Sequence, residues 1–485
     1  MPELKIHQNG IVKVLFFEGA PLLAPLLREH GYAISTPCGS AGVCGRCGVR
    51  AAGSLEPAAV NGRVLACKTR LAGSAEVWLD RPTELNNIAM AGALPMMELK
   101  PHPGDYGMAV DIGTTTLAAM LLDLRTGKPL AAAGAANPQA SLSDNVIGRI
   151  SASLQGEGAR LQDLIHGALR QLEREVFKKA GVKPAAATPT VIAGNTAMLY
   201  FYEGLNPKAL SAAPFLADRL FGEWTKENTY LPRCMGAFLG ADLTLAIVAS
   251  GMCGRGETAL LADIGTNGEI ALWHNGNLFC AAAAAGPAFE GGGISQGLGS
   301  VKGAIDSVKV VGGKLEVTTI GKSPAKGICG SGLVDAAAAL LETGLMDETG
   351  RLEQPEAELA PSVALRQKDI RQFQLAKGAI AAAIGALCQS AGIGNKDIKR
   401  FYLAGGFGTY MRADSAAKIG LIPQELLDRT VVLGNAALTG AAMLLLNSDL
   451  QAESTRIARQ AHVITLSGSA LFSQLFAERM MFERF

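Results

Sequence analysis

The chain has 485 residues, a formal net charge of +1, 18% charged residues and only 5% aromatic residues. This length predicts two or three domains with a large buried core. The near-neutral charge, without a basic stripe or interleaved aromatic residues, argues against nucleic acid as a partner. The N-terminus lacks the apolar segment of a signal peptide, and the longest apolar runs are too short to span a bilayer. We therefore expect a cytoplasmic protein without a membrane partner.

Residues 1–80 predict a small separate domain. Two short strands, at about 3–7 and 11–16, are joined by a Gln-Asn-Gly turn, and a helix follows from Pro21 to about His30. The glycine-rich loop STPCGSAGVCGRC comes next, with the spacing C-x5-C-x2-C, and a further cysteine lies in VLACKT. Thiols clustered in this way in a cytoplasmic chain indicate a metal site rather than disulfides. The four candidate ligands are Cys38, Cys44, Cys47 and Cys67.

These four cysteines could hold a [2Fe–2S] cluster or a zinc ion. Cys44-x2-Cys47 would suit half a zinc site, but the first spacing is x5 and no second C-x2-C pair follows. Glycines let backbone N–H groups approach the sulfurs of a [2Fe–2S] cluster, which we therefore favour. In these residues the segment 1–80 resembles a ferredoxin of the plant or adrenodoxin type, and the resemblance implies a β-grasp fold.

Residues 81–106 contain four prolines and no clear periodicity, which predicts a semi-extended linker. From residue 107 onward strands and helices alternate, which predicts an α/β domain. Asp144 and Asn145 are candidate caps of a helix that begins at Val146. We also expect helices at 161–176, from Thr196, after 327–332 and at 376–391, and strands at 190–195, 400–406 and 431–435.

The sequence Asp-Ile-Gly-Thr occurs twice between an apolar strand and a second half-buried strand, within 109–121 and within 261–273. Such a hairpin suits phosphate, because glycine allows close approach, N–H groups and hydroxyls hold the oxygens, and the carboxylate holds hydrated Mg²⁺. One copy would be weak evidence, since ordinary turns use the same residue types. Two copies suggest a duplicated fold, with halves at about 107–255 and 256–485, that closes on one nucleotide.

Together with LAGGFG at 403–408, the two hairpins resemble the ASKHA superfamily of ATPases, which includes acetate and sugar kinases, chaperones and actin. The resemblance implies an actin/hexokinase-like fold that binds ATP and Mg²⁺. Asp111 and Asp263 would act through metal-bound water, and Glu290 either orients the attacking water or is a turn carboxylate. Glu269 faces either inward or the strand surface. The implied nucleotide-binding residues are Gly113, Thr114, Thr115, Thr116, Gly265, Thr266, Asn267, Gly330, Ser331, Gly332, Gly405 and Gly406.

Further segments narrow the resemblance to the reductive activators of corrinoid proteins, which join an N-terminal ferredoxin to such an ATPase domain. They are NPQASLSDNVIGRI (137–150), AGNTAM (193–198), FLGAD (238–242), GPAFEGG (286–292) and GICGSGLVD (327–335). The resemblance covers nearly the whole chain, although larger members carry an extra domain where this chain has only the linker. It implies ATP-dependent transfer of one electron from the [2Fe–2S] cluster to Co(II) of a corrinoid protein or cobalamin-dependent methyltransferase, which regenerates Co(I) for methyl transfer.

Two other functions stay open from the residues alone. One is a small-molecule kinase with an appended redox-sensing ferredoxin domain, and the other is an ATP-gated binding module with a structural cluster. Cys329 lies where the related 2-hydroxyacyl-CoA dehydratase activators have a cluster ligand, but it has no partner cysteine at a suitable spacing, so we expect a small buried side chain. The sequence leaves the electron donor and a homodimer open.

Overall fold

The computed structural model describes residues 1–8, 11–30, 32, 34, 47–60, 62–79, 94–184, 187–265, 267–408 and 410–485. The predicted site residues Cys38, Cys44 and Thr266 lie outside the described residues, as does the first half of the predicted linker. None of the described helices is both long enough and apolar enough to cross a bilayer.

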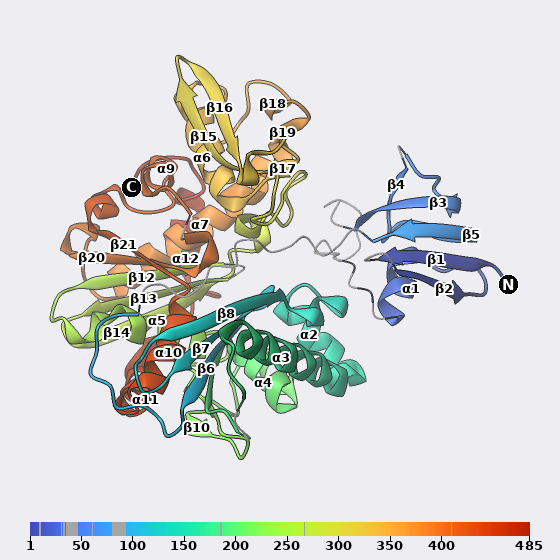
Figure 1. The fold of residues 1–485 in the computed structure, drawn as a ribbon. Coiled ribbons are helices and arrows are strands. Elements are labelled where there is room, and N and C mark those ends of the chain that lie inside the picture. The colour runs from blue at the N-terminus through green and yellow to red at the C-terminus, as the bar shows by residue number, and fades with distance from the viewer. Residues whose placement is uncertain are drawn as a thin grey trace.

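The N-terminal part contains a five-stranded sheet with the order β2-β1-β5-β3-β4, coloured blue in Figure 1. Alternate residues of β1, Leu4 and Ile6, are buried and pack with Leu23 and Leu27 of the helix α1. The structure confirms the two predicted strands and the predicted helix to within two residues. The elements are β1 (Glu3–Gln8), β2 (Ile11–Phe16), α1 (Leu23–Glu29), β3 (Gly48–Glu56), β4 (Arg63–Leu65) and β5 (Arg70–Trp78).

The rest of the chain is built on two six-stranded sheets. The first has the order β10-β11-β9-β6-β7-β8, and the second has the order β21-β20-β12-β13-β14-β22. The first sheet contains β6 (Tyr106–Ile112), β7 (Thr116–Asp123), β8 (Pro129–Ala136), β9 (Thr190–Gly194), β10 (Glu223–Trp224) and β11 (Thr229–Leu231). The second contains β12 (Ala259–Ile264), β13 (Gly268–His274), β14 (Asn277–Ala283), β20 (Arg400–Ala404), β21 (Thr430–Gly434) and β22 (Ala461–Val463).

The two sheets share one core topology. In each, three consecutive strands form an antiparallel meander, and the first of them pairs in parallel with a fourth strand, which pairs in parallel with a fifth. The two Asp-Ile-Gly-Thr sequences occupy the same position, at the turn between the first and second strands of each meander. The structure thus shows the duplication that these two sequences predict.

Helices connect the strands and cover the sheets (Figure 1). Those of the first half are α2 (Val146–Ala152), α3 (Gly158–Ala180), α4 (Thr196–Glu203) and α5 (Ala241–Ser250). Those of the second half are α6 (Gly330–Glu342), α7 (Gln367–Ser390), α8 (Gly405–Gly408), α9 (Ala413–Lys418), α10 (Ala436–Leu446), α11 (Asp449–Gln460) and α12 (Ala470–Glu478). Between β14 and α7 the chain adds the strands β15 (Ala304–Val311), β16 (Lys314–Thr319), β17 (Gly327–Ile328), β18 (Glu356–Ala360) and β19 (Val363–Arg366).

Most helix boundaries follow the sequence pattern, but α7 begins earlier than expected. α3 ends at Gly181, whose φ of 69° is left-handed, and the Asn145 side chain caps α2 through the Gly148 amide, as predicted. The sequence pattern predicts a helix at 376–391, but α7 begins at Gln367. Ile370 and Phe373 belong to its buried face, and the Asp369 carboxylate accepts the Arg366 amide at 3.0 Å, which stabilises the earlier start.

The second half of the predicted linker lies against the first sheet and its helices. The amides of Lys100 and His102 donate to the carbonyls of Leu446 and Leu445, each at 2.9 Å, at the end of α10. The His102 ring lies 4.2 Å from the Trp224 ring, centroid to centroid. This stretch is therefore anchored to the body of the protein by backbone bonds and a ring contact.

The helices α5 and α10 pack against each other between the two sheets (Figure 1). Both are apolar on nearly every side, since they touch the sheets as well as each other. A Cβ atom on Gly440 of α10 would lie 2.2 Å from the Leu245 carbonyl oxygen of α5, so only glycine allows this approach. The relative position of the two sheets depends on this close contact.

We expect Gly440→Ala to lower the free energy of unfolding by about 1–3 kcal/mol, because the methyl group forces the two helices apart. Gly167→Ala in α3 is the matched control, since a Cβ there meets no atom within 4 Å. The control should gain about 0.5–1 kcal/mol from its higher helix propensity. Denaturant unfolding of both variants measures the difference, and equal stabilities would show that α5 and α10 can separate at no cost.

Candidate functional site

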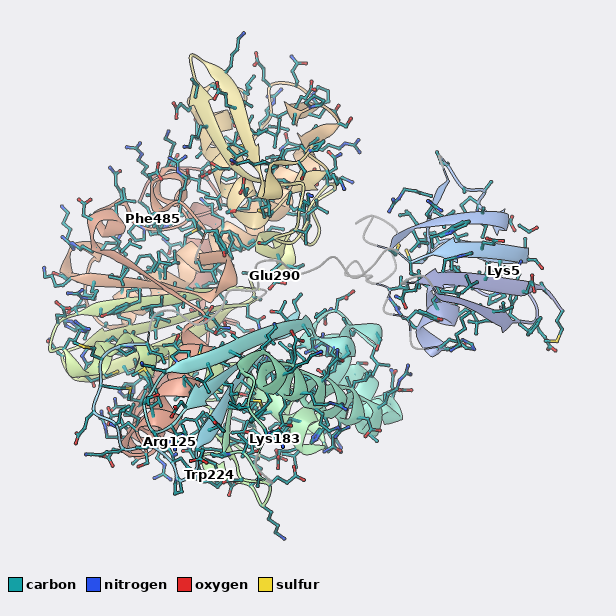
Figure 2. All side chains as sticks on the ribbon, in the orientation of Figure 1. Lys5, Arg125, Lys183, Trp224, Glu290 and Phe485 are labelled. Atoms are coloured by element: carbon teal, nitrogen blue, oxygen red, sulfur yellow. The ribbon has the colours of Figure 1, made fainter. Side chains whose placement is uncertain are left out.

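The two hairpins open into one cavity between the sheets, which we call the inter-sheet cavity. Its volume is about 420 Å³, and Glu290 lies beside it in the gap between the two halves (Figure 2). It brings together residues that lie more than 300 positions apart. The predicted residues that line it are Asp111, Gly113, Thr114, Thr115, Thr116, Asp263, Gly265, Asn267, Glu290, Gly330, Ser331, Gly405 and Gly406.

Two of the predicted glycines are required by close contacts around the hairpins. A Cβ atom on Gly113 would lie 2.7 Å from the Thr116 carbonyl oxygen across the first turn. A Cβ atom on Gly405 would lie 2.5 Å from Oδ1 of Asp263, and the φ of Gly405 is 88°, in the left-handed region. Gly332 does not line the cavity. A Cβ atom there would lie 2.2 Å from the Ile305 carbonyl oxygen, so this glycine serves packing between α6 and β15.

Four carboxyl groups line the cavity together: Glu269 is buried, and Asp111, Asp242 and Asp263 are partly buried. Burial raises the pKa of Asp111 to about 6, although a 2.8 Å hydrogen bond from Nδ2 of Asn435 opposes the increase. Burial, and then repulsion from Asp242 and Asp111, raises the pKa of Asp263 to about 7. The same causes raise the pKa values of Asp242 and Glu269. The site therefore gathers negative charge that a cation would neutralise.

These carboxyl groups do not form a ready-made direct metal site. Among the described residues, no three His, Cys, Asp or Glu side chains converge closely enough to hold a metal ion by themselves. Mg²⁺ in proteins commonly keeps several water ligands and uses only one or two carboxylates. The arrangement fits a hydrated divalent cation whose waters bridge to the carboxylates.

Four lining residues were absent from the predicted site or left open, namely Asn195, Asp242, Glu269 and Asn435. Asn195 and Asn435 each cap a helix through Oδ1 and use Nδ2 to reach the first hairpin. Nδ2 of Asn195 donates to Thr114 Oγ1 at 3.2 Å, while Nδ2 of Asn435 donates to Asp111. One feature of the sequence could have indicated them: each asparagine directly follows a strand that ends in glycine. Glu269 is only 9% exposed and faces the cavity, which settles its direction.

Glu290 connects the two halves of the site. It ends the short 3-10 helix Pro287–Glu290, and its Oε2 accepts a 2.9 Å hydrogen bond from the Thr115 hydroxyl of the first hairpin. Since Thr115 belongs to the first sheet and Glu290 to the second half, this bond spans the cavity. A ligand that engages the Thr115 hydroxyl would therefore change the environment of the Glu290 carboxylate.

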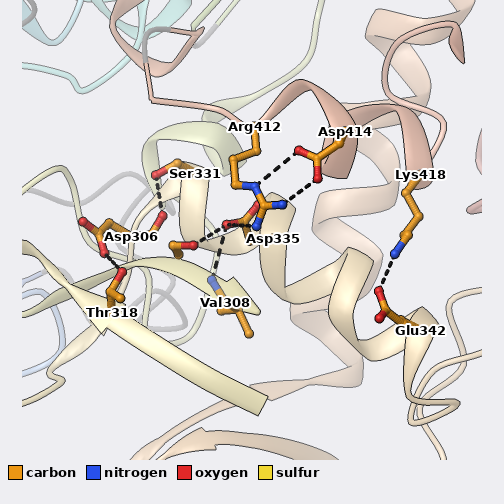
Figure 3. Close-up of polar contacts among 10 residues, drawn as sticks. Asp306, Val308, Thr318, Ser331, Asp335, Glu342, Arg412, Asp414 and Lys418 are labelled. Atoms are coloured by element: carbon orange, nitrogen blue, oxygen red, sulfur yellow. Dashed lines mark hydrogen bonds and ion pairs between the residues drawn. The ribbon is translucent and has the colours of Figure 1, made fainter. Parts of the chain in front are cut away.

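The wall of the cavity formed by α6 is fixed by polar contacts to β15 and α9 (Figure 3). The Ser331 hydroxyl donates to the Asp306 carbonyl at 3.1 Å. The buried Asp335 carboxylate accepts from the Ser307 hydroxyl at 2.8 Å and lies 3.9 Å from the Arg412 guanidinium, which also pairs with Asp414. These bonds hold the start of α6 and the segment after Gly405 in one arrangement.

Three of the described cysteines bear on the predicted cluster site. Cys47 and Cys67 are 1% and 4% exposed, and their sulfurs lie 3.1 Å apart, beyond the disulfide bond length of about 2.0 Å. Two of the four predicted cluster ligands thus converge. Cys329 is buried beside Val301 and Ala304, and its thiol donates to the Ile305 carbonyl at 3.3 Å. This placement agrees with its interpretation as a small buried side chain.

The raised pKa of Asp263 predicts how the free energy of unfolding depends on pH. At about pH 5 the folded chain keeps this carboxyl protonated, whereas an unfolded aspartate, with a pKa of about 3.9, is ionised. The folded state then binds more protons, so the free energy of unfolding falls as the pH rises from about 4 to about 7. We compare Asp263→Asn with the wild type at pH 5 and at pH 8, without divalent cations. The free energy of unfolding of the variant, relative to that of the wild type, should be higher at pH 8 than at pH 5 by up to about 3 kcal/mol.

Denaturant unfolding at both pH values checks this, with Asp449→Asn as the control, because that aspartate side chain is 65% exposed. The control should differ from the wild type by the same amount at both pH values. A constant difference for Asp263→Asn as well would show that its carboxyl is already ionised in the folded chain at pH 5.

Comparison with known proteins places this site in a family. Residues 106–255 match the family model described as the RACo middle region, and residues 257–484 match the C-terminal domain of RACo, the ASKHA domain. The corrinoid activation enzyme RamQ of Eubacterium limosum is 32% identical over 422 residues, which cover 78% of this chain and 70% of that protein. The [Co(II) methylated amine-specific corrinoid protein] reductase of Methanosarcina barkeri is 26% identical over 418 residues, which cover 76% of each chain.

A solved structure agrees with these matches. The reductive activator for corrinoid, iron-sulfur protein superposes with a TM-score of 0.71 and 25% sequence identity, and the match covers 100% of this chain and 99% of that one. The similarity therefore extends over the N-terminal sheet as well as the two larger sheets. The resemblance inferred from the sequence motifs is confirmed. The chain belongs to the RACo family of reductive activators of corrinoid proteins, and its duplicated part is an ASKHA-like α/β fold.

Proposed function

We propose that this chain uses ATP to drive the one-electron reduction of a corrinoid protein from Co(II) to Co(I). Membership of the activator family supports the reaction. The observation that carries the ATP part is the inter-sheet cavity, where both Asp-Ile-Gly-Thr hairpins and the Gly405–Gly406 pair meet beside four carboxyl groups. A kinase would share these features, so the partner and the electron acceptor distinguish the two functions.

In the proposed complex the hairpins hold the phosphate groups and the aspartates hold hydrated Mg²⁺. The hydroxyls of Thr114 and Thr115 and the amide of Asn267 face the cavity and are suitable donors. Mg²⁺ would offset the burial and the repulsion that raise the pKa of Asp263, so its binding releases protons near neutral pH. The nucleoside end fits an adjoining cavity of about 740 Å³, which shares Ser300, Ser331 and Tyr410 with the inter-sheet cavity.

Glu290 is the proposed residue that orients the attacking water. In the structure its carboxylate accepts a hydrogen bond from the Thr115 hydroxyl. A phosphate oxygen competes for the same hydroxyl, because it is also a strong acceptor. The hydrogen bond would then pass from Glu290 to the nucleotide, and the carboxylate would be left to accept a proton of the water molecule.

The N-terminal domain is the proposed electron-transfer domain, with a β-grasp ferredoxin fold. The two described cysteines fit the proposed ligand set, since their buried sulfurs converge without forming a disulfide. A [2Fe–2S] cluster held by Cys38, Cys44, Cys47 and Cys67 would supply one electron at about −400 mV. If the Co(II) couple lies ~100–200 mV lower, the transfer costs about 2.3–4.6 kcal/mol, which ATP could offset.

The test of this function is whether Co(I) formation requires ATP. Mixed with a Co(II) corrinoid protein, Mg-ATP and a low-potential electron donor, the wild type should form Co(I), followed by its absorbance, and the corrinoid protein should accelerate ATP hydrolysis. Asp263→Ala should lower ATP hydrolysis by about 100-fold or more, because it loses a carboxylate that positions Mg²⁺. Cys44→Ser should still hydrolyse ATP and bind the corrinoid protein but should form no Co(I).

Asp449→Ala, at an exposed position, is the control for Asp263→Ala and should behave as the wild type. Full Co(I) formation without a nucleotide would contradict the coupling. Phosphorylation of an added sugar or small acid, without any effect of the corrinoid protein, would favour the kinase.

The cluster is tested separately from activity. Chain purified without oxygen should be brown, contain two irons per molecule and give a rhombic electron paramagnetic resonance signal after one-electron reduction. Cys47→Ser should lose most of the iron. Cys388→Ser, which removes another buried thiol in α7, should keep it. Equimolar zinc without iron in the wild type would favour the zinc site instead.

A further inference from the structure

The first hairpin is held from behind by one segment of the chain, residues 137–149. Three consecutive carbonyls of the hairpin turn each accept a hydrogen bond from this segment. Gly113 O accepts from Nδ2 of Asn137 at 2.9 Å, Thr114 O accepts from Nη2 of Arg149 at 2.7 Å, and Thr115 O accepts from the Asn137 amide at 2.9 Å. No carbonyl of the turn is left to rotate independently.

These bonds fix the direction of the amide groups on the other side of the turn. In a trans peptide, the carbonyl of one residue and the N–H of the next point in opposite directions. Carbonyls that point toward residues 137–149 therefore turn the N–H groups of Thr114, Thr115 and Thr116 the other way. Gly113, Thr114 and Thr115 line the inter-sheet cavity, whereas Asn137 and Arg149 do not. The turn thus stands between the segment 137–149 and the cavity.

The turn amides are available to a ligand. In the part of the chain that the structure describes, the N–H groups of Thr114 and Thr115 donate to no protein acceptor. Unpaired N–H groups beside a cavity are the donors that bind phosphate in glycine-containing loops. In the second hairpin the amide of Gly265, the equivalent of Gly113, donates to the Asn267 carbonyl across the turn at 3.0 Å.

Arg149 is an unusual residue for such a support. Its side chain is fully buried, and it also donates to the Ser143 carbonyl at 2.8 Å and to Oε1 of Gln139 at 3.2 Å. Burial lowers the pKa of the guanidinium to about 10, so the group stays charged at neutral pH. Its planar guanidinium presents donors on three nitrogens in a fixed geometry, whereas the three donors of a lysine lie on a single nitrogen.

We infer that Asn137 and Arg149 are positioning residues, which hold the amides of the first hairpin toward the phosphate groups of the nucleotide. The inference rests on the proposed function, since it needs a phosphate ligand in the cavity. It assigns a reason for the motif NPQASLSDNVIGRI, which contributes neither Asn137 nor Arg149 to the cavity lining. The segment acts through the peptide groups of the turn, and its side chains do not touch the ligand.

The test compares a triphosphate with a nucleoside. We expect Arg149→Met to weaken the binding of the non-hydrolysable analogue Mg-AMPPNP by at least tenfold, while adenosine, measured at millimolar concentration, keeps its affinity. Asn137→Asp keeps an oxygen that accepts the Gln139 amide but removes the N–H donor to the Gly113 carbonyl. It should also lose affinity for Mg-AMPPNP and keep its affinity for adenosine. Arg149→Lys keeps the charge without the fork, so its affinity for Mg-AMPPNP should lie between the wild type and Arg149→Met.

Asn145→Ala is the control, because it removes the cap of α2 in the same segment and touches no carbonyl of the turn. It should lose stability but bind Mg-AMPPNP as the wild type does. If the wild type binds Mg-AMPPNP and both Asn137→Asp and Arg149→Lys bind it equally well, the inference is wrong, while the proposed function stands. An equal loss for adenosine would also overturn it, since the effect would then be general. A wild type that fails to bind Mg-AMPPNP would overturn the proposed function as well.

Discussion

The gathering of four carboxyl groups in a place with little access to water is the constraint that the rest of the structure has to meet. Asp111 and Asp263 come from equivalent strands of the two sheets, while Asp242 and Glu269 add charge from α5 and β13. Burying charge costs free energy unless it is paired or neutralised, so these groups favour separation of the sheets at neutral pH. The apolar packing of α5 against α10 opposes this, and the close approach at Gly440 gives that packing a single geometry. The carboxyl groups that suit a cation ligand therefore lower the stability of the protein without that ligand.

The hairpins, most helices and the duplicated topology were predictable from the sequence because they depend on local patterns. Asp-Ile-Gly-Thr contains the carboxylate, the turn and the hydroxyl within four residues, and the second copy identifies the symmetry. Residues whose role depends on distant partners were not predictable in this way. Asn195 and Asn435 look like ordinary helix caps, since the sequence shows the cap and hides the second hydrogen bond made by the other end of the amide.

Other differences have equally definite causes. Gly332 shares its motif with Gly330 and Ser331, but the direction of α6 turns it toward β15, and spacing alone does not give that direction. Strand alternation left two faces for Glu269, because the sequence does not show which face a second sheet covers. Arg149 supports the hairpin turn through a hydrogen bond to Thr114, 35 residues away. The sequence of the segment 137–150 does not indicate this contact.

The anchored stretch at residues 94–103 sets a limit on how the N-terminal domain can work. Lys100 and His102 are held at the end of α10, so the connection to the N-terminal domain starts from a fixed point on the body. Between Leu79 and Leu94 the covalent chain can span at most about 50 Å, whatever path it takes. In general, two modules joined by a short linker that can span their sites meet at an effective concentration of about millimolar. If the N-terminal domain delivers the electron, as proposed, its encounter with a partner docked on the body is intramolecular, and we expect the rate not to depend on the protein concentration.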